Sequence, residues 1–358
     1  MRHPLFPIIV LMVLGIASCD KEKEKNPTEG NDTIPAVADD TTSIAVNGRL
    51  PGLFSVSESQ QVYFSQGNLQ WSASGSHVVE GGDTLPGTWR FATHQYDMVG
   101  SPSQCNGSEA ASPYNAYPGN VAGSDNAFIA EDYAGWIDLF GWATSGYNGA
   151  LPYSTSLDNS VYGFGGNCGF RPVEDWGSYN AISNGGNAPS LWRTLLGGPL
   201  GEWNYLLSLR SASTVNGTPD ARYATICLLK GSDRIPGLLL FPDTFSWPSD
   251  AGEAPSNINA ASGSRQWSEL PAYTLSQFAA LEKAGCVFLP AAGSRLGTDV
   301  QGVGHEGNYW SSYGFSSEVR HDQHSYYLCI QPNRAKSGEG YLITRCHGLS
   351  VRLIQEKK

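Results

Sequence analysis

The sequence contains little charge, and positive charge is its scarcer sign. Charged residues make up 15% of the 358 positions, with 22 Lys and Arg against 33 Asp and Glu, so the formal net charge is -11. Proteins bind nucleic acid largely through Lys and Arg that displace counterions from phosphates. The charge balance therefore argues against a nucleic-acid-binding protein, and we expect no nucleic acid among the partners.

Motifs that identify common catalytic sites are also missing. The chain has no G-x-S-x-G elbow, no H-E-x-x-H motif and no glycine-rich phosphate-binding loop after a strand. No two cysteines are spaced as C-x-x-C, which argues against zinc-knuckle and thioredoxin-type sites. We therefore expect a non-catalytic binding protein with no cofactor and no metal. A polysaccharide-acting enzyme that uses Glu131, Asp132, Glu174 or Asp175 as acid and base is the alternative.

The longest apolar run stands at the N-terminus. Residues 5–16 have the length of a signal-peptide core and are too short for a comfortable membrane span. The next residues, Ile16-Ala17-Ser18-Cys19, resemble the lipobox of bacterial lipoproteins. The resemblance implies a signal peptide over residues 1–18 and lipidation of Cys19, which becomes the membrane anchor. An ordinary cleaved signal with an incidental cysteine is the alternative.

Residues 19–43 contain almost nothing that could be buried. The charged run Asp20–Lys25 precedes a stretch rich in Pro, Asp and Thr, a composition typical of a disordered tether. The charged run directly after Cys19 resembles the signal that sends lipoproteins of the Bacteroidetes to the outer face of the outer membrane. This resemblance implies a lipid-anchored protein that faces the cell exterior.

Residues 44–358 have the texture of one globular domain, with no obvious fixed-period repeat. Short alternating or apolar segments predict strands at 61–71, 88–92, 236–242, 286–290, 326–330 and 349–353. Apolar spacing predicts two helices, at 200–210 and at 275–284, the second capped by Thr274. The stretch 96–187, rich in Gly, Asn, Ser and aromatics, predicts a long ordered loop. Together these elements predict an α+β fold with short strands.

Cysteine and histidine give weaker signals. Six cysteines remain after Cys19 in a chain that we expect to be exported, so disulfides are permitted. Cys329 and Cys346 lie in neighbouring predicted strands and are the first candidates for a pair, with buried free thiols as the alternative. The spacing of His321 and His324 suits a helix rather than the loop and strand expected there, which argues against a metal site.

Residues from about Phe54 to Ile354 resemble the C-type-lectin-fold lipoproteins of gut Bacteroidetes, which are similar to the variable proteins of diversity-generating retroelements. The stretches that carry the resemblance are VYFSQGNLQW, WRFATHQYDMVG, GWIDLFGWATSGYN, DWGSYNAISNGGN, LWRTLL, RYATI, VFLPAAGSR, GNYWSS and LSVRLI. Formylglycine-generating enzymes share that fold, but their catalytic cysteine pair has no counterpart here. The resemblance implies a C-type-lectin-like fold with antiparallel strands, in which the strand near Val62–Trp71 pairs with the strand near Leu349–Ile354.

The same resemblance divides residues 302–354 into a frame and a displayed surface. It assigns Trp310-Ser311-Ser312, Val351 and Leu353 to the frame and the side chains between them to ligand contact. Large adaptable groups such as tyrosine and arginine are enriched at binding hot spots, which supports this division. The candidate ligand-binding residues are His305, Asn308, Tyr313, Phe315, Glu318, Arg320, His324, Arg334, Glu339, Tyr341, Arg345 and His347.

Gln331-Pro332-Asn333 resembles the calcium- and sugar-binding tripeptide of animal C-type lectins, in which a cis-proline directs two amide oxygens at one cation. The partner Trp-Asn-Asp motif is missing from the chain, so calcium-dependent binding is disfavoured. The sequence thus predicts an adhesin-like surface lipoprotein whose C-terminal loops bind an external glycan or protein. A subunit of a fimbrial tip or an accessory protein of outer-membrane assembly is a further alternative.

Overall fold

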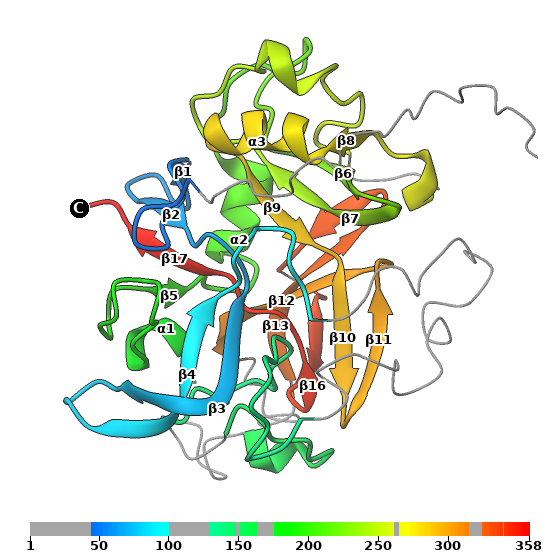
Figure 1. The fold of residues 1–358 in the computed structure, drawn as a ribbon. Coiled ribbons are helices and arrows are strands. Elements are labelled where there is room, and N and C mark those ends of the chain that lie inside the picture. Colours follow the sequence, from blue (N-terminus) through cyan, green and yellow to red (C-terminus); the bar gives the residue numbers. More distant parts are fainter. Residues whose placement is uncertain are drawn as a thin grey trace, which may run out of the picture. The chain divides into compact units, whose positions relative to one another are not determined.

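The computed structural model describes residues 44–99, 129–147, 151–162, 175–260, 265–314, 324–338 and 340–358, which belong to one compact unit, Thr41–Lys358. Over these ranges the protein has an α+β fold that consists mostly of short strands (Figure 1). The expected α+β class is confirmed. The predicted signal peptide, Cys19 and the tether lie outside the described residues. In the part of the chain that is described, no helix has the length and apolar character needed to cross a membrane.

The N-terminal and C-terminal segments of this unit meet in one antiparallel sheet of order β1-β2-β17-β5. Its strands are β1 (Phe54–Ser55), β2 (Gln61–Phe64), β17 (Leu353–Glu356) and β5 (Arg193–Thr194). Ile354 in β17 lies opposite both Phe64 and Arg193, and Ile354 and Phe64 are fully buried. The expected pairing of the two chain ends is therefore confirmed. The last strand begins at Leu353, whereas residues 349–352 make only isolated bridges.

A second four-stranded sheet has the order β8-β6-β7-β9. It consists of β6 (Tyr223–Lys230), β7 (Asp233–Leu240), β8 (Ala272–Thr274) and β9 (Val287–Pro290). Helix α3 (Leu275–Lys283) follows β8 and buries Phe278 and Leu281 in the hydrophobic cluster of this sheet. Thr274 accepts a hydrogen bond from the Gln277 backbone, so the predicted helix and its cap are confirmed. The strands predicted at 236–242 and 286–290 are confirmed as β7 and β9.

The third sheet, which contains Trp310, Ser311 and Ser312 of the predicted frame, has the order β11-β10-β12-β13-β14, with β15 paired to β13 and β16 paired to β10. Its strands are β10 (Ala292–Leu296), β11 (Asp299–Val303), β12 (Gly307–Gly314), β13 (His324–Gln331), β14 (Arg334–Lys336), β15 (Leu342–Thr344) and β16 (His347–Gly348). Trp310, Ser311, Ser312, Val351 and Leu353 are each at most 1% exposed. Burial of the predicted frame positions is therefore confirmed.

A two-stranded ribbon, β3 (Leu69–Val78) with β4 (Thr84–Phe91), extends from the rest of the unit (Figure 1). Its base contributes Trp71 and Trp89 to a cluster with the buried side chains of Trp142, Trp176, Trp192 and Trp310. The single strand predicted at 61–71 is wrong, because the chain turns between β2 and β3. A Cβ atom on Gly67 would lie 2.5 Å from the Ala92 carbonyl oxygen, so this close approach requires glycine.

The helix predicted at 200–210 forms only in part. It consists of α2 (Glu202–Asn204) followed by a five-residue π-helix, Tyr205–Leu209. Leu200 lies before the helix and is 99% exposed, while Arg210 lies after it and is fully buried. The expectation of two helices is also wrong, because α1 (Trp176–Tyr179) forms within the stretch expected to be a loop. Short 3-10 turns occur at Asn159–Tyr162, Ser249–Ala251 and Trp267–Glu269.

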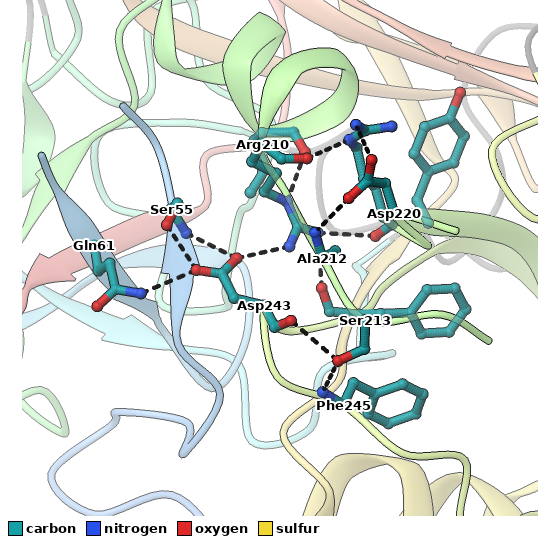
Figure 2. A network of polar contacts seen from close by, with 12 residues as sticks. Ser55, Gln61, Arg210, Ala212, Ser213, Asp220, Asp243 and Phe245 are labelled. Atoms are coloured by element: carbon teal, nitrogen blue, oxygen red, sulfur yellow. Dashed lines mark hydrogen bonds and ion pairs between the residues drawn. The ribbon is translucent and has the colours of Figure 1, made fainter. Parts of the chain in front are cut away.

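Arg210 belongs to a polar network that connects the first sheet to the second (Figure 2). Its Nη1 donates to Asp243 Oδ1 at 2.8 Å, and its Nη2 donates to the Phe241 carbonyl at 2.7 Å. The Asp243 carboxylate also accepts from the Ser55 hydroxyl at 2.7 Å and from the Gln61 amide at 3.0 Å. One buried ion pair thereby holds the N-terminal strands against the middle of the chain.

Cys329 and Cys346 do not form the expected disulfide. Both thiols are free and buried, as are those of Cys227 and Cys286. The Cys346 sulfur lies 3.7 Å from the Thr344 hydroxyl, and burial raises the pKa of the Cys329 thiol to about 11. Buried thiols behave as small apolar side chains, which is the role these four have. Cys105 and Cys168 lie outside the described residues.

Candidate functional site

The predicted ligand-binding residues lie on the third sheet and its connecting loops. Phe315, Glu318, Arg320 and Glu339 lie outside the described residues. The other eight candidates belong to β12, β13, β14, β16, the segments between them or the turn between β11 and β12. The structure divides these eight into buried groups and two separate surface regions.

Two predicted contact residues are buried. The Asn308 side chain is 3% exposed, and its amide donates to Glu306 Oε1 at 3.0 Å. Arg345 is fully buried, with its guanidinium 4.4 Å from the centre of the Trp142 ring and its Nε 3.1 Å from the Ser325 hydroxyl. The expected exposure of these two residues is therefore wrong. Their polar groups have partners inside the protein, so both residues belong to the frame.

The remaining candidates lie at the two ends of β13. His324 begins this strand, next to the end of β12 that contains Tyr313. Arg334 pairs with Gln331 at the other end, and His305 precedes the β12 residues that pair there. A strand of eight residues is about 25 Å long. A small ligand therefore cannot contact both groups, and the candidate site divides in two.

Tyrosine pairs flank the beginning of β13 on both faces of the strand. The Tyr313 and Tyr326 rings stack with centroids 6.0 Å apart and an interplanar angle of 17°. The Tyr327 and Tyr341 rings lie 6.2 Å apart. Tyr326 is nearly buried, whereas Tyr313, Tyr327 and Tyr341 are half-buried. We call these four residues the tyrosine group. Half-buried tyrosines offer a rigid ring together with a hydroxyl for hydrogen bonding.

The loop of residues 197–200 lies beside the tyrosine group. A Cβ atom on Gly197 would lie 2.1 Å from the Ser311 hydroxyl, so only glycine permits this approach to β12. Gly198 adopts a φ of +94° and lies next to Tyr313 and Tyr326. Leu200, at the end of this loop, is 99% exposed. The predicted helix at 200–210 includes Leu200 and leaves this loop out, although the Gly-Gly-Pro run of residues 197–199 indicates a turn.

His324 and His347 are close to each other, but the structure does not form a metal site from them. The Thr344 hydroxyl lies 2.6 Å from His347 Nδ1. Burial, chiefly, lowers the pKa of His347. Among the described residues, no group of three or more His, Cys, Asp and Glu side chains could hold a metal ion. His321 lies outside them.

The segment Gln331-Pro332-Asn333 forms the tight connection between β13 and β14. Over the described ranges no peptide bond is cis, so Pro332 lacks the geometry of the animal-lectin tripeptide. The Gln331 side-chain oxygen accepts from Arg334 Nε at 2.7 Å, and the Pro332 carbonyl accepts from the Thr225 hydroxyl at 2.7 Å. These bonds hold a hairpin turn and occupy an oxygen that calcium would require.

The carboxylates considered for catalysis have different surroundings. Asp175 caps α1 by accepting from the backbone of Gly177 and Ser178, and it also accepts from the Thr194 backbone at 3.0 Å. Desolvation raises the pKa of Asp175 to about 6, and these hydrogen bonds act in the opposite direction. Its donors give Asp175 a structural role. Glu131 and Asp132 are exposed neighbours, and Glu174 lies outside the described residues.

Comparison of the chain with protein-family models, with curated proteins and with solved structures finds no match. The tyrosine group and Leu200 offer rings, hydroxyls and an exposed apolar side chain on a frame of buried strands. Such groups suit reversible contact with a ligand.

Proposed function

We propose that this chain is a lipid-anchored cell-surface protein that binds an external ligand, without catalysis, at the tyrosine group. The observation that carries the proposal is the position of Tyr313 and Tyr341, half-buried beside a loop with a fully exposed Leu200. Tyrosine is among the side chains enriched at binding hot spots, and these half-buried rings combine an apolar face with a hydroxyl.

A protein ligand fits this surface better than a glycan. Leu200 offers an apolar contact that a partner protein can bury, whereas a sugar needs several directed hydrogen bonds. Tyr313 and Tyr326 are already stacked on each other, so little side-chain entropy is lost when they bind. A glycan that stacks on the Tyr313 ring is the second candidate. The phenolic hydroxyl of a tyrosine can act as donor or acceptor to a sugar hydroxyl.

We also propose a C-type-lectin-like arrangement for the globular part. The antiparallel pairing of β2 with β17, which joins the two chain ends, supports it, as does the buried Trp310-Ser311-Ser312 segment. In such an arrangement the paired chain ends form a rigid support, and the sequence of the loops between β12 and β14 is free to vary.

Alanine substitution tests the binding site directly. The double variant Tyr313→Ala, Tyr341→Ala and the single variant Leu200→Asp are displayed on Gram-negative cells, and adhesion to host-cell protein and to a glycan array is measured. We expect each variant to lose at least about tenfold in binding, because truncation of a hot-spot residue typically costs about 2 kcal/mol or more and tenfold corresponds to about 1.4 kcal/mol. Tyr147→Ala is the control, since Tyr147 is 61% exposed and lies outside the tyrosine group. Unchanged adhesion in both test variants would refute the assignment.

The proposed anchor has its own test. Cys19→Ala in the full-length chain removes the residue that would be lipidated, so incorporation of labelled palmitate should be lost and the protein should leave the membrane fraction. Protease treatment of intact cells then reports which side of the membrane the wild-type chain faces. Equal labelling of both chains would show that Cys19 is not the modified residue.

A further inference from the structure

A pocket with a volume of about 260 Å³ lies at the base of the β3–β4 ribbon, away from the tyrosine group. Trp71 and Trp89 are cross-strand neighbours in the ribbon, so their side chains share one of its faces. Both are almost fully buried, at 4% and 1% exposed. The other lining residues are Ala73, His77, Leu85, Pro86, Glu131, Ser145, Gly146, Leu151, Pro152 and Tyr153.

Aromatic rings form much of the wall of this pocket. The Tyr153 ring lies 5.5 Å from the Trp71 ring at an interplanar angle of 41°. Gly87, with a φ of +85°, would place a Cβ atom 2.5 Å from the Trp71 indole nitrogen, so the backbone of β4 presses against that ring. Trp71 therefore has a fixed orientation. Fixed Trp and Tyr faces attract organic cations through the negative charge density of their rings.

Glu131 supplies the one carboxylate among the lining residues, and neither lysine nor arginine lines the pocket. Its carboxylate lies near the Tyr153 side chain. Burial of Tyr153 and the negative charge of Glu131 both raise the pKa of that tyrosine. Arg90, the cation next to Trp89 in the ribbon, belongs to the opposite face and lies 3.6 Å over the Trp136 ring.

Two other polar side chains of the pocket already have hydrogen-bond partners, whereas the buried Trp89 indole nitrogen has none. His77 Nδ1 lies 2.9 Å from the Gly87 carbonyl, and His77 Nε2 lies 2.9 Å from Asn180 Oδ1. The Ser145 hydroxyl accepts from the Tyr147 backbone. A neutral sugar requires several hydrogen-bonding groups that are free to meet its hydroxyls, and this pocket offers few. A ligand with an apolar body and one positive charge matches the lining better.

We propose that this pocket binds the ammonium group of a small organic ligand, such as a methylated amine, with Trp71 and Tyr153 contacting its alkyl groups and Glu131 balancing its charge. The volume lies slightly below the range of roughly 300–1,000 Å³ typical for drug-sized ligands, which suits a compact group. The site is separate from the tyrosine group, so the full-length protein would bind two different ligands.

Choline and its uncharged carbon isostere, dimethylbutanol, test the charge requirement. The full-length protein, purified in a neutral detergent, is titrated with each compound by saturation-transfer NMR at pH 8, where an ordinary histidine is neutral. We expect choline to bind at least about fivefold more tightly than dimethylbutanol, because cation–π contact and the carboxylate act only on the charged compound. A trimethyllysine peptide that binds more tightly than choline would identify a peptide as the source of the ammonium group.

Two matched variants test whether Glu131 causes the preference for choline. Glu131→Gln should weaken choline binding by about fivefold and leave dimethylbutanol binding unchanged, since only the charge is removed. Asp132→Asn makes the same charge change at a neighbouring exposed carboxylate that does not line the pocket, and it should change neither. Equal binding of both compounds to the wild-type protein, or no binding of either, would overturn the proposal. Adhesion of the Glu131→Gln variant should stay normal, which separates this test from that of the tyrosine group.

Discussion

At the scale of the residue, the burial of four arginines is the feature that was hardest to predict from the sequence. Arg210, Arg295, Arg345 and Arg352 are all fully buried. Arg352 donates to the side-chain oxygens of Asn68 and Gln95 and to the Phe288 carbonyl. Burial lowers the pKa of Arg352 to about 10, which still leaves it charged at neutral pH. Such charges are stable inside a protein only when hydrogen bonds replace those of water.

Removal of one carboxylate should therefore destabilise the whole domain. Asp243→Asn leaves Arg210 buried without the negative charge that lies 2.8 Å away. We expect a loss of about 3–5 kcal/mol in the free energy of unfolding, measured by tryptophan fluorescence in urea. Asp220→Asn, a control in the same network (Figure 2), affects a side chain that is 47% exposed and should cost less than about 1 kcal/mol. Equal effects would mean that the Arg210 ion pair has no special role.

A second residue-scale prediction concerns pH. His94 Nδ1 and Asp97 Oδ2 lie 3.0 Å apart, and the hydrogen bond to Asp97 raises the pKa of His94. The pKa of Asp97 is lowered by its bonds to His94, although burial opposes this. Because the folded pKa of His94 is the higher one, its contribution is complete below about pH 6.5 and is lost as the pH rises through the folded value. The contribution of Asp97 is present above about pH 3.9 and is lost as the pH falls through its folded value.

The difference in unfolding free energy between the wild type and His94→Gln should consequently be largest between about pH 4 and pH 6.5 and should shrink on both sides. Denaturant titrations at a series of pH values measure it. His347→Gln provides a contrast of opposite sign, because burial lowers the pKa of His347 and its protonation opposes folding. A flat difference for His94→Gln across this range would refute the coupling with Asp97.

At the scale of the element, capping and apolar spacing predicted the secondary structure correctly where a segment forms its own backbone hydrogen bonds. Helix α3 has Thr274 and Gln277 in a reciprocal capping box and buries Phe278 and Leu281 one turn apart. All of these features depend on residues that are close together in the chain. The segment 200–210 has the same apolar spacing, but Arg193 binds the Glu202 carboxylate and Arg210 turns back to the Leu206 carbonyl. The apolar spacing does not include these contacts. In the structure the helix is short and continues as a π-helix.

The cap of α3 gives an element-scale prediction. Thr274→Ala removes the side-chain oxygen that accepts from the Gln277 backbone at 3.2 Å. We expect the free energy of unfolding to fall by about 1 kcal/mol, which thermal or urea denaturation can measure. Ser276→Ala lies exposed in the first turn of the same helix and removes a hydroxyl without a capping role, so stability should be unchanged or slightly higher. A larger loss in the Ser276 variant would contradict the assignment of the cap.

At the scale of the whole molecule, the last strand completes the fold. β17 lies between β2 and β5, two strands that are more than a hundred residues apart in the chain. Ile354 belongs to the hydrophobic cluster that also contains Phe64, Trp203 and Leu328. Contacts of such long sequence separation form late because the loops that they close carry a large entropy cost. We therefore expect stable folding to require β17.

Graded truncation of Ile354 tests this dependence. Ile354→Val should cost about 1 kcal/mol and Ile354→Ala about 2–5 kcal/mol, because the side chain is fully buried and a cavity would remain. Urea unfolding followed by tryptophan fluorescence measures both values. Lys358→Ala, at an exposed position in the same terminal segment, is the control and should be neutral. Two equal and small losses would mean that the C-terminal strand is not part of the cooperative unit.

The sequence by itself determined the elements whose causes are local. The apolar runs of β7 and β9 and the cap of α3 follow from composition and spacing, whereas the burial of Trp310 was implied by the resemblance. The pairing of β2 with β17 followed only from a family resemblance, since nothing local specifies a partner so distant. Predictions at residues 1–43 and at Phe315, Glu318, Arg320 and Glu339 stay predictions.

Only the tertiary structure decided which polar side chains face outward. Arg345 and Tyr341 look equally displayed in the sequence, yet Arg345 lies under Trp142 while Tyr341 stays half-buried at the surface. The aromatic pocket is a similar case, because Trp71, Glu131 and Tyr153 come from three separate stretches of the chain. Burial and proximity depend on how strands pack across the whole unit, and no short window of sequence contains that information.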